Sequence, residues 1–217
     1  MTRIALILST ALLAAACSDA GETATVTSGE RSSFELPNDH ALGSADAPVT
    51  VVEYASVSCV ACANWSNTVY PDFKERYIDT GEVRYVLREF PAGDPRLFQA
   101  GSMLANCADD KRPGAFFDSV KLQFERFDDI MNTARTAPQS VRDQYVYIAK
   151  QTGLSEDEME ACLADETVRA DLETRIQAGS DAGVNATPTF FVNGTKVKAF
   201  KIEDFETAIA AAKAPEG

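Results

Sequence analysis

The hydrophobic positions of the chain form successive patterns. Residues 49–55 are an almost unbroken apolar run, as expected of a strand in the middle of a sheet that is covered on both faces. A helical pattern begins just after Cys59, and a second strand-like run occupies residues 83–90. From about Asp94 to Gly183 the apolar residues recur at helical spacing, one stripe after another. This middle segment is therefore predicted to be helical throughout.

The helices of the middle segment have recognisable starts. Asp94 followed by Pro95 is typical of a helix N-terminus, because aspartate caps free N–H groups and proline fits the first helical position. Ser155 and Glu158 form the pattern of a capping box. The stripe over residues 116–131 is expected to be one helix, and core rather than a cofactor site. The other stripes begin at Leu97, Val141, Met159 and Val168.

The last part of the chain carries a hairpin signal. Residues 189–192 and 195–198 flank Asn193-Gly194, and both of these central residues favour the positive φ that a tight hairpin turn requires. Apolar residues at helical spacing over residues 202–209 then predict a closing helix that packs on the sheet.

The first sixteen residues are predicted to be an export signal. Arg3 supplies the positive charge, and residues 4–16 are apolar with small residues at the end, a run too short to span a membrane. Residues 14–17, Ala-Ala-Ala-Cys, resemble a bacterial lipobox, which predicts lipidation of Cys17, with ordinary signal cleavage as the alternative. Residues 18–33 are small and polar without periodicity, so a flexible tether is expected between Cys17 and the folded part.

The charge of the chain argues against one class of partner. The sequence has 20 Lys and Arg residues against 33 Asp and Glu residues, a formal net charge of −13. A phosphate-binding face would need a basic cluster, and the sequence contains none. No nucleic-acid partner is therefore expected, and the acidity is interpreted as a source of solubility.

Two cysteines separated by two residues are the strongest chemical signal. Cys59 and Cys62 follow the apolar strand and open the helical pattern, so both are expected near a helix N-terminus. The positive end of the helix dipole and the unpaired N–H groups of the first turn stabilise a thiolate, the nucleophile of thiol–disulfide exchange. A redox pair is therefore predicted. The alternatives are inert core cysteines or half of a zinc site, for which only His40, Cys107 and Cys162 remain, at no usual zinc spacing.

A second motif, far along the chain, extends this interpretation to a family. The segment Ala-Thr-Pro-Thr-Phe-Phe-Val-Asn-Gly at residues 186–194, together with the two cysteines and the lead-in at residues 43–54, resembles the DsbA-like thiol:disulfide oxidoreductases of the thioredoxin superfamily. The resemblance covers roughly residues 36–213. It implies an α/β fold, a thioredoxin fold with an inserted helical domain. The expected division is residues 34–93 and 184–217 for the thioredoxin-like part and residues 94–183 for the insert.

The resemblance also implies roles for particular residues. It makes Cys59 the attacking cysteine and Cys62 the resolving one. It implies a cis peptide bond between Thr187 and Pro188, in a loop that packs beside the disulfide and holds the backbone of the substrate. Glu53 stands six residues before Cys59, where the resembling family carries a buried acid. Such a group can take up or relay the proton of a resolving cysteine.

Glu53 and His40 also have ordinary structural interpretations. Glu53 could lie at a solvated strand end, and if it is buried, Arg84 and Arg88 of the next strand are its candidate partners. His40 stands in a turn-like approach to the first strand. A surface or packing role is expected for His40, because it is the only histidine and has no partner cluster in the sequence.

Cys107 and Cys162 both lie on apolar faces of the predicted insert. If Cys59 pairs with Cys62 and Cys17 carries lipid, these two cysteines are left for each other. Some proteins of the resembling family carry a structural disulfide at such positions, and export to an oxidising compartment favours one here. Two buried free thiols are the alternative.

These observations predict an exported protein-disulfide oxidoreductase of the periplasm or cell envelope, anchored through lipidated Cys17. It would form, isomerise or reduce disulfides in other exported proteins as a monomer, with a membrane redox partner and without a metal or dissociable cofactor. Strongly oxidising members of the family commonly have Pro-His between the cysteines, whereas this chain has Val60-Ala61, so a weaker oxidant is predicted. The alternative is a noncatalytic chaperone or binding protein for unfolded chains, and metal delivery is third.

Overall fold

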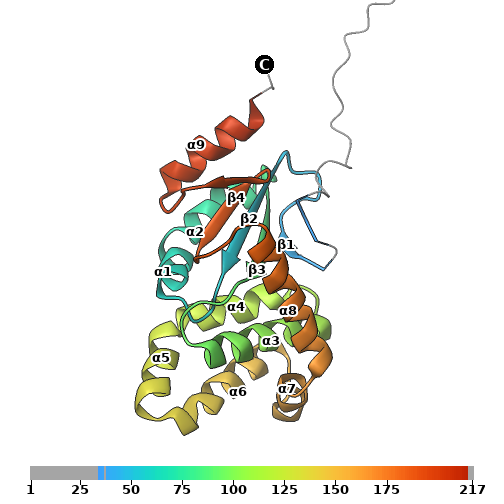
Figure 1. The fold of residues 1–217 in the computed structure, drawn as a ribbon, viewed down its shortest axis with the longest axis vertical. Helices are drawn as coiled ribbons and strands as arrows, with labels where there is room; N and C mark the ends of the chain where they lie inside the picture. The colour runs from blue at the N-terminus through green and yellow to red at the C-terminus, as the bar shows by residue number, and fades with distance from the viewer. Residues whose placement is uncertain (1–33, 37, 215–217) are drawn as a thin grey trace, which may run out of the picture.

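A mixed sheet organises the protein in the computed structural model, which describes residues 34–36 and 38–214 (Figure 1). Within the described residues, five strands form one sheet in the order β1-β3-β2-β4-β5. Strands β2 and β3 are parallel, and the other neighbours are antiparallel. The strands are β1 (His40–Leu42), β2 (Val49–Ala55), β3 (Val83–Glu89), β4 (Thr189–Val192) and β5 (Thr195–Val197).

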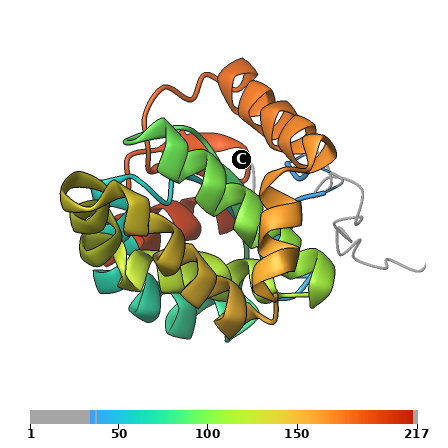
Figure 2. The same ribbon diagram turned by 90° about the horizontal axis from the view of Figure 1, so that it is seen from below.

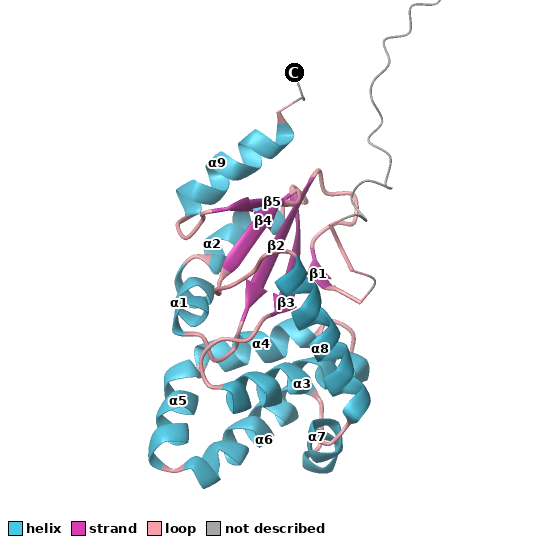
Figure 3. Cartoon of the chain, in the orientation of Figure 1, coloured by secondary structure: helices cyan, strands magenta, loops and turns pink. Residues whose placement is uncertain are grey.

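Strand β2 is central, as its apolar sequence predicts. All seven of its residues are buried, and it lies between β3 and β4. Helices cover both faces of the sheet, with α1, α2 and α9 on one side and α8 on the other (Figure 3). These helices are α1 (Val60–Thr68), α2 (Tyr70–Phe73), α8 (Glu166–Asp181) and α9 (Ile202–Lys213), and a π-helical segment, η2 (Lys74–Ile78), continues α2.

A layer of helices lies across the end of the sheet at which β2 finishes (Figures 1 and 2). Asp94 caps its first helix by accepting from the N–H groups of Arg96 and Leu97, and Ser155 and Glu158 form the predicted capping box. The layer consists of α3 (Pro95–Lys111), α4 (Ala115–Glu125), α5 (Phe127–Thr136), a 3-10 turn η3 (Pro138–Ser140), α6 (Val141–Thr152) and α7 (Glu156–Leu163).

Two details of the sequence-based secondary structure are wrong. The stripe over residues 116–131 is not one helix, because Arg126 leaves helical geometry at φ −99°, ψ 12° and separates α4 from α5. His40 is not in a turn but begins β1, opposite Leu87. The predicted hairpin is present, and Asn193 and Gly194 have the positive φ angles, 43° and 76°, that its turn requires.

The sheet and the helical layer share a core at the start of α1. Phe116, Val120 and Phe124 of α4 belong to the same buried cluster as Cys62 and Trp65 of α1. The two cysteines therefore stand at the junction between the sheet and the inserted helices.

Candidate active site

Cys59 is the N-cap residue of α1. The chain leaves β2 at Ala55 and turns through residues 56–58, and the N–H of Cys59 donates to the carbonyl of Ser56 at 3.0 Å. Cys59 itself has extended backbone (φ −98°, ψ 120°), so its sulfur can accept from the N–H of Cys62 at 3.4 Å. The sulfur thus takes the position in which a serine or aspartate side chain would cap the helix.

The two cysteines have opposite electrostatic environments. The side chain of Cys62 donates to the sulfur of Cys59, and together with the N–H groups of Ala61 and Cys62 this lowers the pKa of Cys59 to about 5, although partial burial opposes the shift. Burial raises the pKa of Cys62 far above its usual range, and the neighbouring Cys59 and Glu53 add to the effect. At neutral pH the Cys59 side chain is therefore ionised, whereas Cys62 stays a buried thiol.

The loop before β4 lies directly against Cys59. The peptide bond between Thr187 and Pro188 is cis. The sulfur of Cys59 stands 3.4 Å from the carbonyl oxygen of Thr187, although the two residues are 128 positions apart in the sequence. Pro188 is buried and Thr187 is partly exposed. A segment of another chain that reached Cys59 would thus lie next to Thr187.

Glu53 is buried beneath the cysteine pair. Its alternation along β2 places it on the same face as Val51 and Ala55, which pack in the core cluster that contains both cysteines. Only 1% of Glu53 is exposed, so the structure excludes the solvated strand end. Burial raises the pKa of its carboxyl group to about 8, against the opposing effect of a hydrogen bond from the hydroxyl of Tyr85. Glu53 is accordingly a neutral carboxylic acid at neutral pH.

The partners predicted for Glu53 are wrong. Arg84 pairs instead with Glu35 at 2.8 Å, and Arg88 pairs with Asp39 at 2.6 Å. The partner that the sequence analysis did not identify is Tyr85, which alternates with the two arginines along β3 and therefore lies on the opposite face of the sheet from them. Strand alternation would have favoured Tyr85 once the parallel register of β2 and β3 was known.

A cavity of about 500 Å³ reaches Glu53, and neither Cys59 nor Cys62 is among its lining residues. It lies between the first helices after β2 and helix α4, and its walls are largely aromatic and apolar. Exposed side chains such as Asn67 and Lys121 line its mouth. The inner wall is formed by Glu53, Trp65, Tyr70, Tyr85, Leu87, Phe117, Val120 and Phe124.

Two further cysteines of the described residues form a pair of their own. Cys107 of α3 and Cys162 of α7 are joined by a disulfide, with 6.2 Å between their Cα atoms. Cys59 and Cys62 are free thiols in the structure. Cys17 lies outside the described residues, and so do the predicted export signal and tether.

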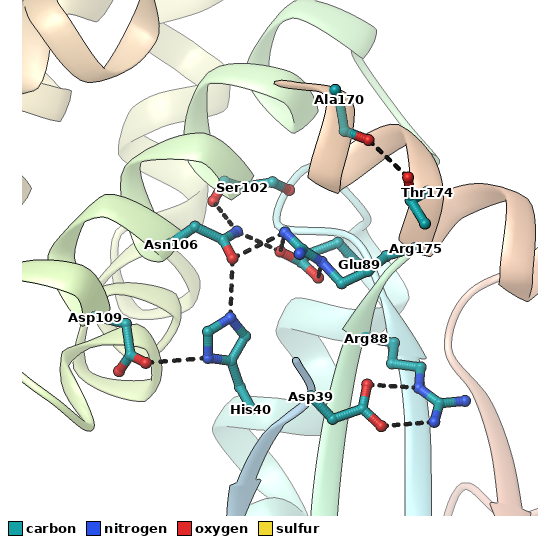
Figure 4. Close-up of polar contacts among 10 residues, drawn as sticks. All are labelled: Asp39, His40, Arg88, Glu89, Ser102, Asn106, Asp109, Ala170, Thr174 and Arg175. Carbon is teal, nitrogen blue, oxygen red and sulfur yellow. Dashed lines mark hydrogen bonds and ion pairs between the residues drawn. The ribbon is translucent and has the colours of Figure 1, made fainter. Parts of the chain in front are cut away.

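His40 belongs to a polar network between the sheet and the helices (Figure 4). Its ring stacks on Phe116 with 3.7 Å between centroids. Its Nε2 lies 2.9 Å from Oδ1 of Asn106, and its Nδ1 lies 3.3 Å from Asp109. Because the amide nitrogen of Asn106 donates to Glu89, the amide oxygen is the acceptor, and His40 donates from Nε2. His40 therefore packs β1 against α3 and α4, in agreement with the packing role expected of it.

Metal-ligating residues do not gather in the described part of the chain, where no three His, Cys, Asp or Glu residues are grouped so as to hold an ion. Within residues 34–36 and 38–214, no helix combines the length and apolar character needed to cross a membrane.

Comparison with known proteins places these features in context. The family model described as Thioredoxin matches residues 35–211. A Rickettsia bellii protein named as a protein-disulfide oxidoreductase is 32% identical over 176 residues, which cover 79% of this chain and 63% of the relative. The chain thus spans less than two thirds of the length of that relative. Disulfide bond formation protein D of Bacillus subtilis is 29% identical over 164 residues, 73% of this chain and 69% of that protein.

Solved structures give the same result for the fold. Wolbachia pipientis alpha-DsbA1 superposes with a TM-score of 0.70 at 27% identity and covers 82% of this chain and 92% of its own. BdbD from Bacillus subtilis, in its oxidised form, superposes with a TM-score of 0.71 at 23% identity, over 80% of this chain and 92% of its own. The latter likeness is one of fold, because its sequence identity is low.

Proposed function

This chain belongs to the thioredoxin family, with the DsbA-like form of the fold in which helices are inserted into the sheet domain, and we propose that it is an exported protein-disulfide oxidoreductase. The observation that carries the proposal is that its two cysteines have opposite pKa shifts. Cys59 caps a helix and has a pKa of about 5, whereas Cys62 is fully buried and keeps its proton. Thiol–disulfide exchange needs one cysteine that ionises to a thiolate and one resolving thiol.

The reaction follows from the different ionisation of Cys59 and Cys62. In the oxidised protein, a client thiolate attacks the sulfur of Cys59, a mixed disulfide forms, and the bond to Cys62 breaks with both electrons passing to Cys62. A second client thiolate then attacks the client sulfur of the mixed disulfide and releases Cys59 as a thiolate. The client gains a disulfide and the cysteine pair gains two electrons. The low pKa of Cys59 makes it a good leaving group in this second step.

Glu53 is the proposed proton donor for Cys62. A thiolate at Cys62 would be buried without a solvent shell, so it must be protonated as it leaves. With a pKa of about 8, Glu53 holds a proton at neutral pH and lies close enough to Cys62 to influence its ionisation. The cavity beside Glu53 gives water a route by which the carboxyl group can recover its proton.

The client is proposed to lie along the loop of Thr187 and Pro188. The carbonyl of Thr187 already faces the sulfur of Cys59, so an extended client segment would pass beside it. Val60, next to Cys59, is 69% exposed and offers an apolar surface to the client. We propose exported proteins with cysteines as clients, a membrane partner that resets the redox pair, and attachment to the membrane through lipid on Cys17.

The direction of transfer is proposed to favour disulfide donation. A pKa of about 5 for Cys59 stabilises the reduced form, and this makes the disulfide form an oxidant. That value lies between about 3.5 for the strongly oxidising DsbA and about 7 for thioredoxin. The chain is thus proposed to be a weaker oxidant than DsbA, in line with Val60-Ala61 between its cysteines.

A trapping experiment tests the proposal. The full chain carrying Cys17→Ser, to avoid lipid attachment, is oxidised and mixed with a reduced, unfolded protein. The unaltered cysteine pair should form client disulfides. Reduced Cys62→Ser, mixed with a client that already contains a disulfide, should accumulate a mixed disulfide, because Cys59 attacks the client disulfide, releases one client thiolate and is not resolved. Cys59→Ser should do neither. If Cys59→Ser suppresses client aggregation as well as the parent chain, and the parent chain transfers no disulfide, the protein is a noncatalytic chaperone.

A further inference from the structure

The turn between β2 and α1 (residues 56–58) is joined by hydrogen bonds to the link between β3 and α3 (residues 90–94). Ser58, the residue before Cys59, is only 3% exposed, and its hydroxyl lies 2.5 Å from the carbonyl oxygen of Ala92 and 3.1 Å from that of Asp94. The hydroxyl of Ser56 donates to the same carbonyl of Ala92 at 2.8 Å. The Ala92 carbonyl oxygen has two lone pairs and can accept both hydroxyl groups.

The link also approaches the turn through its backbone. Gly93 has φ +78°, and a Cβ atom there would lie 1.9 Å from the carbonyl oxygen of Ser58. A side chain at this position would push the link and the turn apart. Residues 90–94 are the crossing from the sheet to the helical layer, because β3 ends at Glu89 and Asp94 caps α3. Residues 90–94, the crossing, thus pack against Ser58, the residue that precedes Cys59.

These hydrogen bonds determine the backbone conformation in which Cys59 caps α1. The Ser56 hydroxyl that donates to Ala92 also accepts from the N–H of Ser58 at 3.2 Å, and the Ser56 carbonyl accepts from the N–H of Cys59. These bonds fix the extended backbone with which Cys59 caps α1. The direction from the Cys59 sulfur to the N–H groups of the first turn therefore depends on the conformation of residues 56–58, which the hydroxyls of Ser56 and Ser58 both join to the carbonyl of Ala92.

We propose that Ser58 is a positioning residue for thiol–disulfide exchange, whose hydroxyl clamps the start of the active-site helix to the crossing into the helical layer. The inference rests on the proposed function of Cys59 and Cys62. Ser58 does not contact the reacting sulfur in any hydrogen bond of the described structure. It acts by holding the donors of the first turn in line with that sulfur, so the clamp stabilises the reduced, thiolate form.

The test measures the equilibrium of the Cys59–Cys62 pair with reduced and oxidised glutathione, in the full chain carrying Cys17→Ser. Ser58→Ala should shift this equilibrium about fivefold towards the disulfide form, the effect expected when one N–H donor of the first turn is no longer aligned with the thiolate. The thiolate absorbance of Cys59 should titrate at a higher pH in the same variant. Ser58→Thr, which keeps a hydroxyl group, should restore most of the equilibrium. Ser180→Ala, which removes an exposed helix hydroxyl that bonds the carbonyl of Ile176, is the matched control and should change neither measurement.

The outcomes separate the inference from the function on which it rests. If the unaltered pair does not exchange with glutathione, the proposed function is wrong. If the pair exchanges and a folded Ser58→Ala variant has the equilibrium and titration of the parent chain, the inference is overturned. A shift that is equal in Ser58→Ala and Ser58→Thr also overturns it, since the hydroxyl would then have no part. Should Ser58→Ala fail to fold, Ser56→Ala removes the neighbouring bond to Ala92 and is expected to shift the equilibrium in the same direction.

Discussion

Tyr85 donates its phenolic hydrogen to Glu53 across two neighbouring parallel strands, β3 and β2, beneath the cysteine pair. Both side chains are almost completely buried. Burial raises the pKa of Tyr85 well above its usual range, and the neighbouring Glu53 adds to that shift. The phenol therefore stays a donor, and Glu53 is the group of the pair that titrates, with a pKa of about 8.

The first prediction concerns how stability depends on pH. The pKa of Glu53 is raised from 4.5 in the unfolded chain to about 8 in the folded protein, so folding favours its protonated form. Its contribution is complete below about pH 4.5 and is lost as the pH rises through 8. Relative to Glu53→Gln, the protein should lose about 1.4 kcal/mol of unfolding free energy per pH unit between pH 5 and 7.

The measurement is urea unfolding of both proteins in the Cys59–Cys62 disulfide form. In the reduced form the lowered pKa of Cys59 contributes stability with the opposite pH dependence, which would mask the effect. Gln can still accept from Tyr85, so the comparison removes only the titration. A stability difference that stays constant from pH 5 to 7 would show that Glu53 is ionised in the folded protein.

A second prediction concerns the thiolate itself. In the reduced protein, absorbance near 240 nm should report ionisation of Cys59 with a midpoint near pH 5. Cys62→Ala should raise that midpoint by about one unit or more, because the thiol of Cys62 is the largest stabilising influence on the thiolate. Cys59→Ser should abolish the signal in this range. A midpoint near 5 that survives Cys62→Ala would show that the Cys62 thiol is not the main source of the stabilisation, which would then come from Thr187 and the helix N–H groups.

Local sequence patterns identified most of the fold and the position of Cys59 and Cys62 at the start of a helix. The apolar run of β2, the capping signals at Asp94 and Ser155 and the Asn193-Gly194 turn each depend on neighbours along the chain, and each is present in the structure. The family resemblance to a thioredoxin fold with inserted helices is also confirmed by the family match and the superposed structures.

Contacts between distant segments could not be derived in this way. Glu53 contacts Tyr85 and not Arg84 because of the strand register and of the face of the sheet on which each side chain lies. Neither can be deduced from the spacing of residues along the chain. No sequence motif marks Ser58, because its hydroxyl contacts Ala92, which lies 34 positions further along the chain. His40 was placed outside the strands because β1 has only three residues, too few for a periodic pattern.

A third prediction concerns the disulfide between α3 and α7. It closes a loop of 55 residues, so removing it should cost about 4 kcal/mol of unfolding free energy in the chain-entropy treatment. The double variant Cys107→Ala/Cys162→Ala should therefore unfold at a clearly lower urea concentration than the parent chain without reductant. In chains that also carry Cys59→Ser, adding a reductant should lower the midpoint of the chain that keeps the bridge and leave that of the chain without it nearly unchanged. Equal midpoints without reductant would show that the bridge adds nothing to stability.

The last prediction concerns the ion pair that joins the sheet to the helices. Arg175 of α8 donates from Nε to Oε2 of Glu89 at 2.9 Å and from Nη2 to Asn106 of α3 at 2.8 Å, and both charged side chains are buried (Figure 4). Arg175→Met would leave the carboxylate of Glu89 buried without its cation, which should cost about 3 kcal/mol of unfolding free energy. Glu89→Gln combined with Arg175→Met should recover part of that loss, because the stranded charge is gone.

Lys121→Met is the matched control for this experiment. Lys121 pairs with Glu125 at 2.9 Å, but both side chains are largely exposed and solvent screens the pair. Its removal should hardly change the urea midpoint. If Arg175→Met were as mild as Lys121→Met, or if adding Glu89→Gln made the loss larger, the network would not be what holds α8 and α3 to β3. The packing of Gly179 against Tyr54 and Phe90 would then be the principal attachment of α8 to the sheet.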